Sequence, residues 1–307
     1  MTDYHAPVLP REVLAALAPA PGKRFVDGTL GGGGHTATLL EAGAEVLGLD
    51  RDQDALTAAE KRCAEFGDRF RTVHGNFADM ATLLREAGWD AVDGVLLDIG
   101  VSSFQLDEPD RGFSFQSDGP LDMRMDQSSG LSAADVVNTY SEDGLKQILR
   151  EFGEEKHASR IARAIVEERQ RRPFATTRDL AGVVERVYPG YSKRHPATRT
   201  FQAIRMEVNE ELDSLERGLK GAADLLRPGG RLAVITFHSL EDRIVKNFFR
   251  DRGQRWLDRP EWPAPRPNPD FLFDPICRKP IEAADDEVGG NPRSRSAKLR
   301  WGERHQP

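Results

Sequence analysis

The sequence has little cysteine and no long hydrophobic run, and both shortages narrow what the chain can be. Its 307 residues include only Cys63 and Cys277, too few for a disulfide framework or a multi-cysteine metal site. No apolar stretch approaches the roughly 18–20 residues that a membrane span needs. The first residues lack the basic start and apolar stretch of a secretory signal, so we expect a cytoplasmic protein without a membrane partner.

The chain also lacks an excess of positive charge. Lys and Arg number 43 against 50 Asp and Glu, for a net charge of −7, which excludes a nonspecific polycation. Any contact with a nucleic acid must therefore come from a local basic patch. The seven histidines show no HExxH or comparable ligand spacing, so we expect no catalytic metal.

What is present is a regular alternation of strands and helices in two stretches of the chain. Such alternation predicts a parallel sheet with helices on both faces. A third stretch between them is helical throughout, which predicts an α/β domain formed by residues 1–105 and 211–307 around an inserted helical domain, 106–210. The predicted strands are Arg24–Thr29, Glu45–Asp50, Phe70–His74, Val92–Ile99, Arg231–Phe237 and Ala297–Trp301. The predicted helices are Asp54–Phe66, Ala133–Tyr140, Glu142–Phe152, Glu155–Arg171, Thr177–Val187, Asn209–Leu226 and Leu240–Arg252.

A glycine run follows the first predicted strand and opens a helix, over residues 26–35. Glycines let the backbone approach a ligand, and free N–H groups at a helix start favour anionic groups. Asp50 ends the second strand, where a carboxylate can accept hydrogen bonds from both ribose hydroxyls of an adenosine. Both NAD and S-adenosylmethionine fit this pattern. The glycine spacing departs from GxGxxG, and Phe77 follows the third strand where adenine packs in methyltransferases, so S-adenosylmethionine is favoured.

Two further segments end strands on the same edge of the predicted sheet. Asp98 ends the fourth strand, where its carboxylate can accept hydrogens from a target amine or position the methionine part of the cofactor; a turn cap is the alternative. His238 follows the strand 231–237 and can orient substrate or relay a proton, while a helix cap at Ser239 is the structural alternative. Neither cysteine is a good candidate for the nucleophile of cytosine-C5 methylation, which leaves nitrogen or oxygen as the methyl acceptor.

The helical insert is basic although the chain is acidic. Between residues 155 and 205 twelve positive and five negative side chains leave a charge of +7. Three of them, Lys156, Arg160 and Arg163, are spaced to share one face of a helix, and Arg194 and Arg199 lie in a basic loop at 192–202. A solvated helix face is the alternative to a phosphate-binding surface.

The ordered set of motifs from about residue 5 to 300 resembles the MraW family, bacterial methyltransferases that act on cytosine N4 of small-subunit ribosomal RNA. The resemblance rests on residues 5–9, 33–35, 98–103, 111–115, 118–125, 153–155, 195–203, 237–243 and 293–297. Its departures are mild: Ile99 and Thr236 replace the usual leucine and serine.

The resemblance implies a Rossmann-like class I methyltransferase that transfers a methyl group from S-adenosyl-L-methionine to N4 of one cytidine in the decoding region of 16S ribosomal RNA. Its partner is a near-assembled small subunit, and a homodimer is compatible with the sequence. The alternatives are a non-catalytic RNA-binding assembly protein and a methyltransferase with another substrate. The cofactor-binding residues carried over by position are Gly33, Gly34, His35, Asp50, Phe77, Asp98 and Gln105.

Overall fold

The computed structural model describes residues 7–188 and 195–306, and these divide into two compact units. One, the sheet unit, comprises the residues up to Gly100 and those from Leu212 onward. The other, the helical unit, is Val101–Glu211. The sequence places the first junction five residues later, at 105/106. Residues 101–105 therefore belong to the helical unit, which matters for Gln105.

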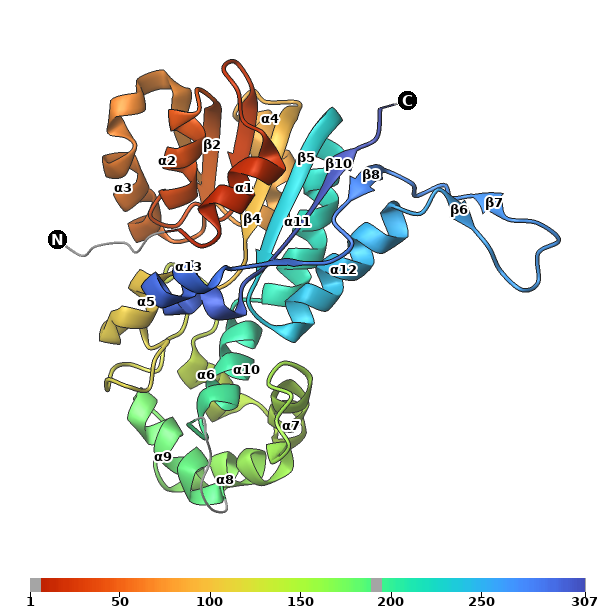
Figure 1. The fold of residues 1–307 in the computed structure, drawn as a ribbon. Helices are drawn as coiled ribbons and strands as arrows, with labels where there is room; N and C mark the ends of the chain where they lie inside the picture. The colour runs from red at the N-terminus through yellow and green to blue at the C-terminus, as the bar shows by residue number, and fades with distance from the viewer. Residues whose placement is uncertain (1–6, 189–194, 307) are drawn as a thin grey trace. The chain divides into compact units, whose positions relative to one another are not determined.

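The sheet unit is built on strands in the order β3-β2-β1-β4-β5-β10-β8, with β9 beside β10 (Figure 1). Strands β1 to β5 pair in parallel, whereas β10 runs antiparallel to β5 and β8. This order confirms the predicted Rossmann-like α/β fold. The strands are β1 (Arg24–Asp27), β2 (Glu45–Asp50), β3 (Phe70–His74), β4 (Val92–Asp98), β5 (Leu226–Thr236), β8 (Phe273–Ile276), β9 (Ile281–Glu282) and β10 (Lys298–Arg304).

Alternating side chains of the central strands enter two different cores. In β4, Val95 and Leu97 pack with helices α4, α11 and α12, while Leu96 packs with α1 and α2. Period-two alternation of buried residues on both faces is what a sheet covered on both sides requires. The helices of this unit are α1 (Pro10–Leu17), α2 (Gly34–Glu41), α3 (Gln53–Arg62), α4 (Met80–Glu86), α11 (Glu211–Leu225), α12 (Ser239–Arg252) and α13 (Asp285–Gly290).

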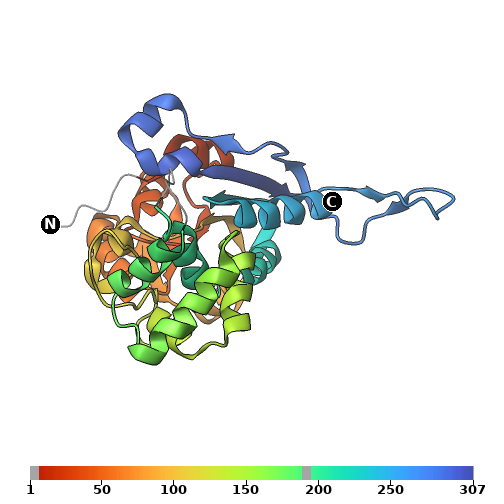
Figure 2. The same ribbon diagram turned by 90° about the horizontal axis from the view of Figure 1, so that it is seen from below.

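The sheet unit differs from expectation after residue 225. The strand predicted from Arg231 begins at Leu226, and the segment 227–230 forms a bulge inside β5, because Val92 of β4 pairs with Leu226 and Gly94 pairs with Arg231. The short strands β8 and β9 and the helix α13 are not predicted, since prolines and short length hide their periodicity. A hairpin of β6 (Trp256–Leu257) and β7 (Arg266–Pro267) extends away from α12 (Figures 1 and 2).

The helical unit has its own apolar core, formed by α6 to α10 and the loop before them. Helix starts are marked by hydroxyl caps: Ser132 and Thr176 each form a capping box with an aspartate three residues later. The helices are α5 (Ser103–Asp107), α6 (Ala133–Thr139), α7 (Glu142–Glu151), α8 (Ala158–Arg171), α9 (Thr177–Val187) and α10 (Thr198–Val208).

Two expectations about this unit are wrong. The helix predicted from Glu155 begins only at Ala158, because the Glu155 carboxylate accepts a hydrogen bond from the His157 N–H (2.8 Å) and holds a turn there. The loop predicted at 192–202 becomes helical from Thr198. Within the described residues, no helix is long and apolar enough to cross a membrane.

Candidate functional site

The glycine run forms the loop between β1 and α2, at the carboxyl edge of the sheet. Gly33 has φ 75° and is the N-cap residue of α2. A β-carbon at that position would lie 3.1 Å from the Ala59 Cβ, so both the backbone conformation and the close approach of α3 require glycine. The N–H groups at the start of α2 are thereby presented at the strand ends.

Asp50 ties this loop to the end of β2. One of its carboxylate oxygens accepts a hydrogen bond from the Gly31 N–H (2.8 Å) and the other accepts one from the Asp52 N–H (2.9 Å). Each carboxylate oxygen can accept more than one hydrogen bond, so the group retains acceptor capacity for ligand hydroxyls. Burial raises the Asp50 pKa to about 6, against the lowering effect of both backbone donors.

Asp98 ties the other side of the loop to the end of β4. Its backbone N–H donates to the Thr29 Oγ1 (2.6 Å), and its Oδ2 lies 3.6 Å from the Nε2 of His35. The Asp98 Oδ1 and the His35 Nδ1 are buried and have no hydrogen-bond partner among the described residues. Buried polar atoms of this kind need a partner, which makes them candidate ligand contacts.

A carboxylate beneath the loop was missed by the sequence reasoning. Asp27 ends β1 and is 1% exposed; its Oδ2 accepts from the Thr36 hydroxyl (2.8 Å) and its Oδ1 from the Thr29 N–H (3.3 Å). Burial raises its pKa, and the neighbouring His35 acts in the opposite direction. An acid placed directly before a glycine run is the signal that could have identified it.

Phe77 lies beside the same loop. A β-carbon on Gly28 would be 3.2 Å from the Phe77 Cβ, and one on Gly218 of α11 would be 2.4 Å from the Phe77 ring. The preceding Asn76 donates to the Ser214 hydroxyl of α11 (3.0 Å). The ring is therefore held between the glycine loop and α11, and it remains partly exposed.

Of the seven residues expected to bind the cofactor, the structure brings six together in the sheet unit. They are Gly33, Gly34, His35, Asp50, Phe77 and Asp98. Gln105 belongs to the helical unit, where it is 5% exposed and its Oε1 accepts from the Ser102 N–H (3.0 Å) in the capping box of α5.

His238 begins α12, directly after β5, which pairs with β4. The predicted alternative of a Ser239 cap is wrong, because His238 is the N-cap residue and Ser239 is already helical. The His238 Nε2 lies 2.7 Å from the Glu241 Oε1, and the Glu241 Oε2 accepts from the Phe237 N–H (2.9 Å). The imidazole at this end of the sheet therefore lies against a buried glutamate.

The expected RNA-binding residues that the structure describes lie in the helical unit, but they do not share one helix. Arg160 and Arg163 project from α8 and are exposed, and both line a shallow hollow on that helix. Lys156 is exposed but precedes the helix, so the predicted three-residue stripe on one helix face is wrong. Arg199, on α10, donates to the Glu154 carbonyl (2.9 Å). Arg194 lies outside the described residues.

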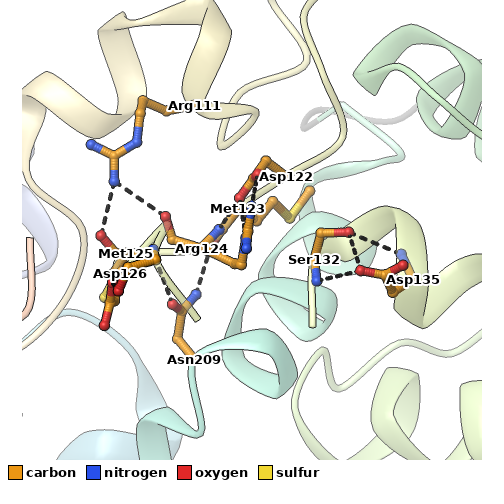
Figure 3. Close-up of polar contacts among 10 residues, drawn as sticks. Arg111, Asp122, Met123, Arg124, Met125, Asp126, Ser132, Asp135 and Asn209 are labelled. Atoms are coloured by element: carbon orange, nitrogen blue, oxygen red, sulfur yellow. Dashed lines mark hydrogen bonds and ion pairs between the residues drawn. The ribbon is translucent and has the colours of Figure 1, made fainter. Parts of the chain in front are cut away.

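Figure 3 shows how the loop before α6 is held within the helical unit. The Asn209 amide donates to the Met123 carbonyl (2.7 Å) and its Oδ1 accepts from the Met125 N–H (2.8 Å). Arg111, 5% exposed, donates to the Arg124 and Met125 carbonyls. Met123 is buried at φ 60°, so these polar groups hold a strained backbone in place.

The strand order, the glycine loop and the acidic strand ends define the class of Rossmann-like methyltransferases. The chain belongs to the MraW methylase family, whose sequence model matches residues 2–305. It is 54% identical over 302 residues to a protein of Syntrophotalea carbinolica named ribosomal RNA small subunit methyltransferase H, covering 96% of each chain. A protein of the same name from Deinococcus deserti is 55% identical, with 98% of this chain and 93% of the relative covered.

Among solved structures, an rRNA methylase from Streptococcus thermophilus aligns with a TM-score of 0.41 and 13% identity, covering 96% of this chain and 93% of that one. The prediction of S-adenosylmethionine as cofactor is confirmed. The sheet unit fits that group: Asp50 has acceptor capacity for ribose hydroxyls, the α2 N–H groups suit a carboxylate, and the unpartnered Asp98 Oδ1 suits an ammonium or amine.

Proposed function

We propose that this chain transfers a methyl group from S-adenosylmethionine to N4 of one cytidine in the decoding region of 16S ribosomal RNA. Its substrate is a near-assembled small ribosomal subunit, and its compartment is the cytoplasm. The names of the relatives, at 52–55% identity over nearly the whole chain, support the RNA substrate. Sedimentation of the purified protein tests whether two copies associate.

The observation that carries the proposal is the partly buried Asp98 carboxylate at the end of β4, whose Oδ1 atom is buried and has no hydrogen-bond partner among the described residues. S-adenosylmethionine, when bound, supplies a methyl group already activated by its sulfonium. The protein then has to align and activate the amine. A carboxylate that accepts a hydrogen bond from the N4 amino group directs the nitrogen lone pair toward the methyl group. We also propose that His238, which lies against Glu241, orients the substrate at the neighbouring strand end.

The state of the cysteines argues for nitrogen rather than C5 as the acceptor. Methylation at C5 requires a thiolate that attacks the ring. The Cys63 thiol is buried against the Gly33 carbonyl, and burial raises its pKa to about 11. Burial also raises the pKa of Cys277, which follows β8 on the sheet edge. Neither thiol is poised as a nucleophile.

We propose the following cofactor contacts, which the geometry of the loop supports. Asp50 accepts the ribose hydroxyls, Phe77 packs against the adenine, and Gly33, Gly34 and His35 face the methionine part. Gln105 is proposed only from its position in the family pattern. For the RNA we propose the exposed cations Lys156, Arg160, Arg163 and Arg199 of the helical unit, and we add Arg194, which lies outside the described residues, from the sequence alone.

The test measures N4-methylcytidine by mass spectrometry in small-subunit RNA from cells whose only copy of the enzyme is Asp98→Ala. Asp90→Asn, an exposed carboxylate preceding the same strand, is the matched control. We expect the methyl level to fall to background in Asp98→Ala cells and to stay normal in the control. An unchanged level in Asp98→Ala cells would remove the assigned role of Asp98.

A further inference from the structure

The hairpin that extends from the sheet unit is anchored too firmly to be a loose loop. We call residues 253–272 the arm; it leaves the end of α12 and returns to β8 (Figures 1 and 2). At its base Asn268, 8% exposed, donates both amide hydrogens, to the Asp251 and Gln254 carbonyls (2.7 Å each). The Leu272 N–H donates to the Arg252 carbonyl (2.7 Å). These bonds fix the direction in which the arm leaves the sheet unit.

The anchored arm carries an aromatic side chain outside any core. Trp256, on β6, is 57% exposed, and among the described residues only Leu131 is a comparably exposed large apolar side chain. Its backbone pairs with Pro267 of β7. Proline fixes the backbone and lowers the entropy lost on binding, so the tryptophan is presented on a stiff support.

Two arginines flank a second tryptophan further along the arm. The guanidinium carbons of Arg259 and Arg266 lie 4.9 and 4.8 Å from the ring centroid of Trp262. Stacking holds each guanidinium plane while its N–H edge remains available for hydrogen bonds. Among the described residues, neither arginine takes part in an ion pair, whereas Arg255 at the base pairs with Asp274 (2.8 Å).

This combination is one that nucleic acids satisfy. Exposed aromatic rings stack on unpaired bases, and preorganised guanidiniums donate pairs of hydrogen bonds to phosphate oxygens. The arm also contains Asp258, Glu261 and Asp270, so its net charge is near zero. Recognition would therefore depend on the placed arginines and the tryptophan, not on bulk positive charge.

We propose that the arm is a second RNA-binding element, which contacts small-subunit RNA away from the methylated nucleotide. Arg259 and Arg266 bind phosphates, and Trp256 stacks on an unpaired base or a ribose. The inference rests on the proposed function, since it takes ribosomal RNA as the substrate. It adds a contact from the sheet unit to those already proposed for the helical unit.

The experiment measures binding of the full-length protein to purified small subunits between about 50 and 300 mM salt. The variants are Arg259→Gln/Arg266→Gln, Trp256→Ala and the conservative Trp256→Phe. The control is Lys23→Gln/Arg85→Gln, two exposed cations of the sheet unit that precede β1 and end α4. Sedimentation gives the mass of each variant, calorimetry its affinity for S-adenosylhomocysteine, and thermal unfolding its stability.

We expect the double arginine variant to bind roughly 10-fold or more weakly. The salt slope, by which we mean the slope of log affinity against log salt concentration, should become shallower by about two, one for each phosphate contact. Trp256→Ala should bind about 5-fold or more weakly, because a stacking contact is lost, and Trp256→Phe should retain most of the affinity. The control and the cofactor affinity should not change.

Two outcomes overturn the inference. Arm variants that bind and methylate small subunits like the unmodified protein show that the arm makes no RNA contact. A Trp256→Ala protein of halved mass with unchanged RNA binding shows that the arm joins two copies of the chain. If instead the unmodified protein neither binds nor methylates small subunits, the proposed function fails, which is a separate result.

Discussion

The glycine loop of the sheet unit and the basic face of the helical unit are both candidate binding regions, but they are built differently. The loop is held at three neighbouring strand ends: its backbone donates to the carboxylates of Asp27 and Asp50, and its Thr29 hydroxyl accepts from the Asp98 N–H. The basic face is the set of exposed side chains Lys156, Arg160, Arg163 and Arg199, which lie on α8, on α10 and in the turn before α8. A site for a small molecule is preorganised, whereas a surface for RNA acts through charge and tolerates rearrangement.

The largest expected effect is on cofactor affinity when Asp50 is removed, because its carboxylate both holds the loop and is proposed to bind the ligand. Asp50→Ala deletes the acceptor for the ribose hydroxyls and leaves the Gly31 N–H without its partner, so the loop and the ligand contact are lost together. We expect the affinity for S-adenosylhomocysteine to fall about 100-fold or more, because a charged acceptor contributes about 1.5–3 kcal/mol per hydrogen bond. Calorimetric titration measures this, with Asp90→Asn as the control. An affinity within threefold of the unmodified protein would show that Asp50 does not bind the cofactor.

The second effect is on the stability of the helical unit, and it concerns a residue that holds the fold together and is not one proposed to bind RNA. Asn209→Ala removes the amide that bonds the Met123 carbonyl and the Met125 N–H, both in a strained segment (Figure 3). We expect a loss of about 2–3 kcal/mol in the free energy of unfolding, since buried backbone groups lose their partners. Calorimetric unfolding should show the shift in the transition of the helical unit, with cofactor affinity unchanged. Equal melting of the variant and the unmodified protein would contradict this account of the segment.

A smaller effect is expected when the basic face is neutralised. Arg160→Gln/Arg163→Gln/Arg199→Gln should weaken binding to small subunits and reduce its salt slope by up to about three, one for each phosphate contact. Cofactor affinity should stay the same, because these residues belong to the helical unit. Filter binding at several salt concentrations measures the slope, with Lys23→Gln/Arg85→Gln for comparison. A slope equal to that of the unmodified protein would identify the face as merely solvated.

The smallest effect is a pH dependence of cofactor affinity. Burial raises the Asp50 pKa to about 6, so this carboxyl takes up a proton as the pH falls through 6 and loses acceptor capacity. Affinity should therefore be constant above about pH 7 and fall by up to about tenfold per pH unit below 6. His35 and Asp27 lie nearby, so Asp50→Asn serves as the control and should flatten the profile. An equally steep fall in Asp50→Asn would assign the dependence to another group.

Much of the sheet unit could be predicted from the sequence, because its residue patterns are each compatible with a single local structure. The strands at 45–50 and 70–74 are found at their predicted bounds, since β-branched and apolar residues between loop signals favour strands; the first is mostly buried, and the second lies at the sheet edge and is partly exposed. The grouping of Gly33, Asp50 and Asp98 follows, because adjacent parallel strands end at one edge.

Other features depended on contacts between residues far apart in the chain. The start of α8 shifted because Glu155 bonds the His157 N–H and also accepts from the Tyr188 hydroxyl (2.6 Å). The Asp27 carboxylate accepts a hydrogen bond from Thr36, nine residues away, and the Met123 carbonyl in the strained loop accepts one from Asn209. Periodicity carries no information about such pairs, so these residues were not identified.

The central claim is that the glycine loop, held between Asp50 and Asp98, binds S-adenosylmethionine. A crystal structure of the protein with S-adenosylhomocysteine tests it most directly. We expect ribose hydroxyls within hydrogen-bond distance of the Asp50 carboxylate and the homocysteine part beside the start of α2 and Asp98. Ligand bound elsewhere, with the Asp50 and Asp98 carboxylates still out of contact with it, would contradict the account.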